Sequence, residues 1–129
     1  MERSADWFRQ AERDLEKARH DLEGAFFEWA CFTSHQAAEK ALKAVFQSRH
    51  QAARGHALLD LLRGLAESPA PGEDLFHAAR ILDRYYIEAR CPNGFPSGAP
   101  LDYFDRKLAQ EALDAAEAIL RFCRSHLDR

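Results

Sequence analysis

Residues 26–50 read FFEWACFTSHQAAEKALKAVFQSRH and contain neither glycine nor proline. Apolar or small side chains recur at steps of three and four along this segment, at Phe27, Cys31, Ser34, Ala38, Ala41 and Val45. This spacing places them on one face of a helix. Small residues on that face allow neighbouring helices to approach closely. We therefore predict that residues 26–50 form the central and most buried helix of the protein.

The polar residues of this segment are the candidates for a functional role. A mostly buried helix leaves little room for solvated side chains, so its polar residues need partners. His35 and Glu39 lie one helical turn apart, and a carboxylate at that distance can hold and polarise an imidazole for acid/base chemistry. The alternative is a histidine that is satisfied by its helical neighbour at a seam between helices. Gln36, Lys40 and Lys43 are the other polar residues beside this pair.

A second amphipathic helix is predicted before the central one. Its N-cap is Ser4, it continues to about Glu23, and Gly24 ends it. The break before residue 26 is short, so we expect the two helices to pack antiparallel as a hairpin.

Three more helices are predicted after the central one. Residues 56–67 form a short helix, and the prolines of SPAPG at residues 68–72 end it. Residues 73–90 form a longer helix. The last helix follows Asp105, its predicted N-cap, and continues to about Leu127.

The segment CPNGFPSGAPLDYF, residues 91–104, contains three prolines and two glycines and cannot form a regular element. A loop of this length is either functional or a rigid crossover between the last two helices. No alternating apolar pattern predicts a strand. The predicted fold class is all-α: an up-and-down bundle of four long helices plus one short helix, in a single domain over residues 1–129.

The formal net charge of −3 and the pI near 6.1 argue against a dedicated nucleic-acid-binding domain, which would be basic. The charge is unevenly distributed. Between Lys40 and Arg63 there are five basic residues and one acid, a local sum of +4, whereas the first 28 residues hold eight acids and five bases, a sum of −3. A modest basic patch or an ordinary solvated face follows from this run.

The three cysteines, Cys31, Cys91 and Cys123, are odd in number and lack C-x-x-C spacing, which is typical of reduced thiols. The N-terminal MERSADWFRQ is charged and has no apolar core, unlike a signal peptide. No run of about 18 apolar residues predicts a membrane span. We therefore expect a cytoplasmic protein that does not associate with membranes.

Several kinds of site are missing from the sequence. There is no G-x-x-x-x-G-K-[ST] or G-x-G-x-x-G motif to hold phosphates. A di-iron bundle needs Glu-x-x-His pairs, and zinc needs clustered cysteines and histidines; neither pattern occurs. We predict no metal and no cofactor.

Tyr85, Tyr86 and Arg90 form a second polar cluster beside the Pro/Gly-rich loop. Aromatic rings with an arginine can stack on a base or hold a phosphate. The alternative is that one tyrosine belongs to the core and its hydroxyl caps the loop backbone.

Four segments together resemble the prokaryotic HEPN domain family. They are ACFTSHQAAEKALKAVF in the central helix, GHALLDLL at residues 55–62, LDRYYIEARCPNGFPSG at residues 82–98, and EALDAAEAILRF in the last helix. The resemblance extends from about Ala5 to Phe122. It implies an up-and-down helical bundle, dimerisation through helix faces, and pairing with a small nucleotidyltransferase encoded nearby, often as a toxin–antitoxin module.

The resemblance also implies a metal-independent ribonuclease, in which an arginine is followed by a histidine after four to six residues. After Arg90, where this motif is sought by analogy, positions 95–97 are Phe, Pro and Ser. Of three literal matches elsewhere, Arg121 with His126 is the pair to test first because it lies on the last helix. The enzyme assignment therefore stays open and leans towards no catalysis.

We expect a helical module that binds a nucleotide, a small nucleotidyltransferase partner, or both, in a groove beside the central helix. Its predicted lining is His35, Glu39, Lys40, Lys43, Tyr86 and Arg90. In this hypothesis the lysines and Arg90 meet phosphate, Tyr86 stacks, and Glu39 with His35 hydrogen-bonds a base or sugar. The alternatives are a ribonuclease toxin acting as a dimer and a purely structural oligomerisation scaffold.

Overall fold

The computed structural model describes residues 2–65, 70–88 and 95–127, and in these residues every regular element is helical. The predicted all-α fold class is confirmed. The elements are α1 (Ser4–Glu23), α2 (Phe27–Ser48), α3 (Leu58–Gly64), α4 (Glu73–Asp83), α5 (Tyr85–Glu88), the 3-10 turn η2 (Pro100–Asp102) and α6 (Arg106–Leu127). No described helix is both long enough and apolar enough to span a lipid bilayer.

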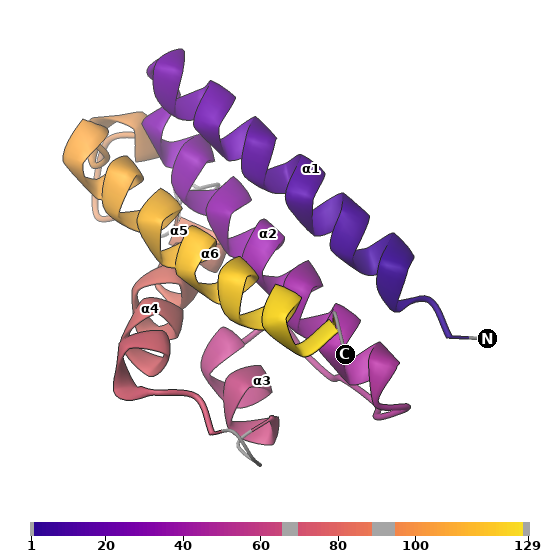
Figure 1. Cartoon of the computed structure of the whole chain (residues 1–129). Coiled ribbons are helices and arrows are strands. Elements are labelled where there is room, and N and C mark those ends of the chain that lie inside the picture. Colours follow the sequence, from indigo (N-terminus) through magenta and orange to yellow (C-terminus); the bar gives the residue numbers. More distant parts are fainter. Residues whose placement is uncertain (1, 66–69, 89–94, 128–129) are drawn as a thin grey trace.

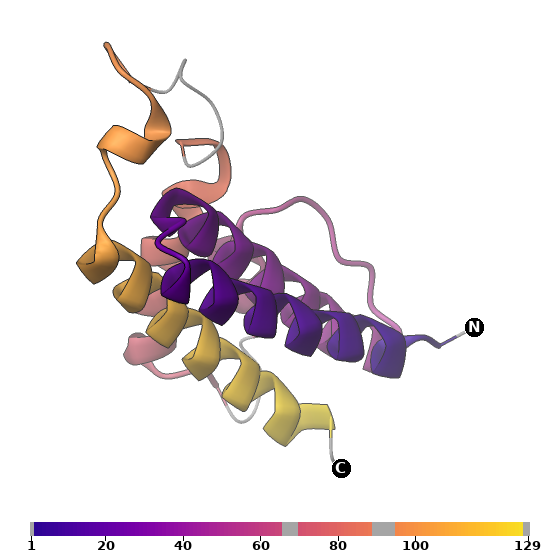
Figure 2. The same cartoon turned by 90° about the horizontal axis from the view of Figure 1, so that it is seen from above.

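The three long helices α1, α2 and α6 pack side by side, and the shorter α3 and α4 cover the remaining side of α2 and α6 (Figure 1). Helix α2 touches α1, α3, α4, α5, α6 and η2. Twelve of its 22 residues are buried, so it is the central helix that the sequence predicts. Seen from above, η2 and the chain around it extend beyond one end of the bundle, opposite the two termini (Figure 2).

Small side chains bring these helices together. Ala37, Ala38, Ala41 and Ala44 of α2 are fully buried, and so are alanines of α1 and α6. An alanine on each side of a helix contact lets the axes approach closely, and larger side chains such as Leu42 and Ile119 fill the space between.

The ends of the long helices test the predicted caps. Asp105 caps α6 as predicted, because its carboxylate accepts the N–H of Leu108 at 2.9 Å. Ser4 is wrong as N-cap: Arg3 occupies that position, and Ser4 is the first helical residue, its N–H donating to Glu2 Oε1. Gly24 ends α1 as predicted. The left-handed residue at this corner is Ala25, with φ of 65°.

Two helices are shorter than the sequence predicts. Instead of spanning residues 56–67, α3 begins at Leu58, because the carboxylate of Asp83 accepts the N–H groups of Leu58 and Leu59. The helix predicted over residues 73–90 is divided at Arg84 into α4 and α5. On either side of this break, Asp83 and Tyr86 both contact His35 of α2, and these tertiary contacts compete with continuous helical geometry.

The predicted connections fall partly outside the described residues. Of the segment 91–104, residues 95–104 are described, and they contain the short turn η2 where we expected no regular element. The prediction for residues 68–72 concerns a turn of which only 70–72 are described. Cys31 and Cys123 are free, buried thiols. Burial raises the pKa of Cys31 to about 12 and that of Cys123 further, so neither forms a reactive thiolate at neutral pH. Cys91 lies outside the described residues.

Enlarging a buried alanine of α2 tests the close packing. We expect Ala38→Leu to lower the free energy of unfolding by about 1–3 kcal/mol, because the added carbons have no space between the helices. Chemical denaturation measures this. Ala5→Leu, on the exposed side of α1, is the matched control and should change little. Equal effects of the two substitutions would contradict the packing described.

Candidate functional site

Polar side chains from four parts of the chain meet beside α2. We call this group the Glu39 cluster: His35, Glu39 and Lys43 of α2, His56 before α3, Asp83 at the end of α4, and Tyr86 of α5.

Glu39 is the shared acceptor of this cluster. Its residue is 6% exposed, and its Oε2 atom accepts from Lys43 Nζ and from His56 Nδ1, both at 2.9 Å. The other oxygen, Oε1, is buried without a hydrogen-bond partner among the described residues and lies 3.9 Å from His35 Nδ1. Two charge-assisted contacts on one oxygen hold the carboxylate in a fixed position.

His35 is fully buried between oxygen atoms. Its Nε2 lies 3.3 Å from Asp83 Oδ1, and its Nδ1 lies 3.2 Å from Gln36 Oε1. Both ring nitrogens therefore have a polar partner, one on α2 and one at the end of α4. The predicted pair of His35 and Glu39 is therefore a longer contact, and the hydrogen bonds of His35 go to Asp83 and Gln36. His35 is fully buried and its ring lies against Tyr86, so in this structure it positions the other groups of the cluster.

Asp83 joins His35 to the start of α3. Its two oxygens accept the N–H of Leu58 at 2.7 Å and that of Leu59 at 3.0 Å. Burial by itself raises the pKa of Asp83, but the hydrogen bonds from His35 and from these two N–H groups outweigh it, so the pKa is below its usual value. Asp83 is therefore ionised at neutral pH and pins α3 to the end of α4.

The accessible part of the cluster is a stacked pair of rings. His56 and Tyr86 have centroids 4.8 Å apart and planes inclined by 15°, and the His56 side chain is 54% exposed. His35 supports Tyr86 from below, with ring centroids 5.1 Å apart. Because Glu39 accepts from His56 Nδ1, the neutral ring carries its lone pair on Nε2.

The structure brings together His35, Glu39, Lys43 and Tyr86 of the predicted lining and places Lys40 elsewhere. The ammonium of Lys40 pairs with Asp14 of α1. Arg90 lies outside the described residues. Of the basic run, Lys40 and Lys43 are engaged by carboxylates and Arg49 by His126, which leaves Arg54 and Arg63 exposed. The two lysines of this run are therefore neutralised by carboxylates and do not contribute to a continuous basic patch.

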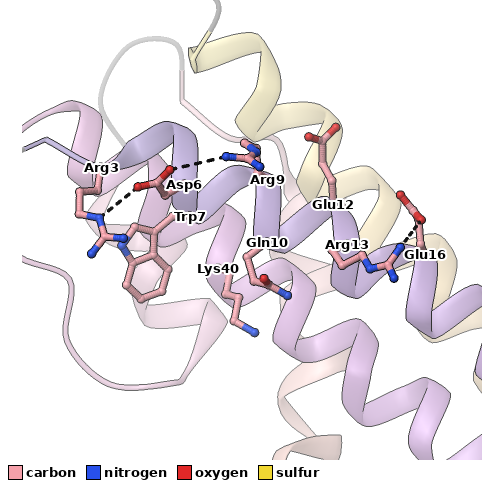
Figure 3. Close-up of a pocket in the computed structure, with 9 residues that line it drawn as sticks. All are labelled: Arg3, Asp6, Trp7, Arg9, Gln10, Glu12, Arg13, Glu16 and Lys40. Carbon is pink, nitrogen blue, oxygen red and sulfur yellow. Dashed lines mark hydrogen bonds and ion pairs between the residues drawn. The ribbon is translucent and has the colours of Figure 1, made fainter.

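Lys40 borders a groove along α1 that is lined mainly by residues of α1 (Figure 3) and by no residue of the Glu39 cluster. The charged residues of α1 pair along their own helix, with Asp6 between Arg3 and Arg9, and Arg13 beside Glu16. Because acids and bases alternate and neutralise one another, this groove resembles an ordinary solvated helix face.

The two residues of the candidate ribonuclease pair, Arg121 and His126, both lie on α6 but have different surroundings. The His126 ring faces Phe122, with centroids 4.4 Å apart, and its Nδ1 lies 3.1 Å from a guanidinium nitrogen of Arg49. Arg121 is exposed on α6.

Two members of the cluster, His56 and Asp83, were not predicted as site residues. Both lie in the segments that carry the family resemblance, GHALLDLL and LDRYYIEAR, which is the signal that points to them. Among the described residues, no group of three or more His, Cys, Asp or Glu side chains is arranged to hold a metal ion.

The all-helical fold agrees with the comparisons with known proteins. The HEPN domain model matches residues 4–126. The chain belongs to the HEPN domain family. No curated protein matches it significantly.

Three solved structures are similar over nearly their whole length. TT1696 from Thermus thermophilus is 44% identical, with a TM-score of 0.94 over 98% of this chain and 99% of that one. ST0689, an archaeal HEPN homologue, is 38% identical, with a TM-score of 0.82 over 97% and 98%. The HEPN domain protein tm0613 from Thermotoga maritima is 40% identical, with a TM-score of 0.79 over 96% and 98%.

Asp83→Asn tests the ionised link between α3 and α4. A carboxyl whose pKa is lowered by folding stabilises the protein above its unfolded pKa, near 3.8, and loses this contribution as the pH falls through the lower folded value. We expect the variant to be less stable than wild type at pH 6, and the difference to shrink below about pH 3.8. Urea unfolding across this pH range measures the difference in stability, and Asp114→Asn, on the exposed side of α6, is the control. A difference that is independent of pH would contradict the assignment.

Proposed function

We propose that this HEPN domain binds a nucleotide at the stacked pair of His56 and Tyr86. The observation that carries the proposal is the accessible ring pair held over the buried carboxylate of Glu39. Aromatic and imidazole rings stack on nucleobases of any kind, typically contributing about 1–3 kcal/mol per base. Because Glu39, His35 and Asp83 fix these rings beforehand, little side-chain freedom is lost on binding.

His56 also supplies a directional contact. With Nδ1 donating to Glu39, Nε2 of the neutral ring accepts a hydrogen bond, and a ribose hydroxyl or an exocyclic amine of a base is a suitable donor. The carboxylate behind the ring fixes its orientation, so Nε2 keeps a defined direction for this contact.

The phosphates meet arginines in this proposal. Arg54 and Arg84 are exposed and lie two residues from His56 and from Tyr86 in the chain. No ion pair is found for either one within the described residues, in contrast to Lys40 and Lys43, whose ammonium groups are held by Asp14 and Glu39. An exposed guanidinium is free to hold a phosphate in bidentate geometry.

The partner expected from the family resemblance belongs to the same proposal. A small nucleotidyltransferase uses a nucleotide as substrate, and a HEPN module that holds a nucleotide beside it would act as one half of a two-component, toxin–antitoxin-like system. Co-expression with the products of the flanking genes tests this part separately: recovery of the chain alone, with no nucleotidyltransferase at stoichiometric amounts, would count against the pairing.

Calorimetric titration with nucleoside triphosphates tests the binding site. We expect saturable binding to the wild type. The affinity of His56→Ala should be lower by about tenfold or more, because this substitution removes one ring of the stack and the contact from Nε2. Arg84→Ala should weaken binding of the triphosphate more than that of the nucleoside.

Arg121→Ala is the matched control, because Arg121 is also exposed but lies on α6, and the affinity of this variant should equal that of wild type. No heat with any nucleotide would contradict the proposal. Cleavage of single-stranded RNA that is lost in His126→Ala would instead favour the ribonuclease alternative.

A further inference from the structure

A second surface lies at the end of the bundle where α1 turns into α2. Large apolar side chains that are exposed gather here, and we call them the aromatic end: Phe26, Trp29, Leu101 and Tyr103. They are all the exposed large hydrophobic residues of the described part of the chain. The first two belong to the α1–α2 corner and the others to η2 and its end; α2 and η2 are in contact, and both views show them at the same end (Figures 1 and 2).

The segment around η2 is built to present its apolar residues. The Tyr103 ring stacks on Phe95, with centroids 4.2 Å apart and planes inclined by 13°, and its hydroxyl donates to the carbonyl of Ser97 at 2.5 Å. The carboxylate of Asp102 accepts the N–H of Ala99 at 2.9 Å. Leu101, held within this turn, is 64% exposed. Its exposure is therefore a property of an ordered segment.

The α1–α2 corner is equally fixed. Ala25 adopts a left-handed conformation, which lets the N–H of Phe26 donate to the carbonyl of Asp21 at 2.8 Å. The guanidinium of Arg106 lies 5.1 Å from the centre of the Phe27 ring and ties α6 to this corner. Phe26 is nevertheless 58% exposed. A rigid, exposed group of aromatic side chains is typical of a protein-binding surface.

The charges beside the aromatic end have one dominant sign. Its two segments, residues 23–29 and 101–107, contain four acids and two bases, a sum of −2; they are Glu23, Glu28, Asp102, Asp105, Arg106 and Lys107. In the part of the chain that the structure describes, no ion pair is found for any of the four carboxylates, unlike the paired charges of the α1 groove. The apolar surface therefore has a rim of net negative charge, in which Asp102 and Asp105 also accept backbone N–H groups.

We propose that the aromatic end docks a basic amphipathic segment of a partner protein. Apolar side chains of that segment would cover Leu101 and Trp29, and its lysines or arginines would meet the rim carboxylates. A second copy of this chain fits poorly, because a two-fold contact through this surface would bring two acidic rims together. An anionic membrane surface is repelled by the same rim.

This surface is continuous with the Glu39 cluster. The Trp29 and Phe32 rings are 6.2 Å apart, Phe32 and Tyr86 are 6.3 Å apart, and Tyr86 stacks on His56. A segment seated on the aromatic end therefore reaches the edge of the proposed nucleotide site. The docking proposal does not require that a nucleotide bind there.

Trp29 is a direct reporter of this surface. The chain has two tryptophans, so Trp7→Phe leaves Trp29 alone to be followed by fluorescence. The probe is a synthetic amphipathic helix made of leucine and lysine, and the control peptide has glutamate in place of lysine. We expect saturable binding of the lysine peptide with a blue shift of Trp29 emission, weakening with salt, and no binding of the glutamate peptide.

Leu101→Glu separates docking from simple charge attraction. This substitution adds a negative charge, so attraction of a basic peptide by charge alone would become stronger, whereas docking against Leu101 predicts about tenfold weaker binding. Leu101 is exposed, so the variant folds normally. Ala5→Glu, exposed near the start of α1 and so at the opposite end of that helix from the aromatic end, carries the same added charge and should not weaken binding.

Three results would overturn the proposal: equal binding of both peptides, unchanged or tighter binding to Leu101→Glu, or a homodimer in sedimentation that Leu101→Glu dissociates. The last result would assign the surface to a second copy. The nucleotide affinity of Leu101→Glu separates this proposal from the proposed nucleotide site. If the variant loses peptide binding but binds nucleotide as wild type does, the substitution has changed the docking surface alone.

Discussion

A buried carboxylate on a buried helix constrains this structure more than any other group. Transferring the charge of Glu39 out of water is costly unless partners compensate for it, and Lys43 and His56 do so on a single oxygen. Since Lys43 is on the same helix, the long-range part of this compensation comes from His56, in the segment that leads into α3. Beside it, His35 and Asp83 connect α2 to the end of α4. These contacts determine where α3 starts and where Tyr86 lies. They therefore bring the rings of His56 and Tyr86 together.

Features encoded locally were predictable from the sequence. The periodicity of residues 26–50 and the alanines within it predict a buried central helix. Asp105 predicts the start of α6, because its capping hydrogen bond joins residues only three positions apart in the sequence. The start of α3 was not predictable, because it depends on Asp83, 25 residues away in the sequence. The same holds for the division of α4 and α5, where side chains on both sides of Arg84 contact other helices. No glycine or proline marks that division.

The candidate site was predictable in part for the same reason. Residues 35, 39 and 43 are spaced by four, so they share one face of α2 and could be grouped from the sequence. Lys40 is one residue further along than Glu39, which rotates it by about 100° towards α1, where Asp14 holds it. His56 and Asp83 are separated from their partners by 17 and 48 residues. Only the folded chain shows that Glu39 orients His56, and that this ring is exposed to solvent whereas His35, which is nearer to Glu39 in the sequence, is buried.

Nitrogen-15 NMR of the histidine rings tests this orientation directly. At a pH where the imidazoles are neutral, the two tautomers differ in which ring nitrogen carries the proton, and His77, exposed on α4, is an internal reference. If Glu39 holds His56 as described, the proton of His56 lies on Nδ1 and the lone pair on Nε2. A neutral His56 protonated on Nε2 would show that Glu39 does not orient the ring, and the site derived from this contact would be incorrect.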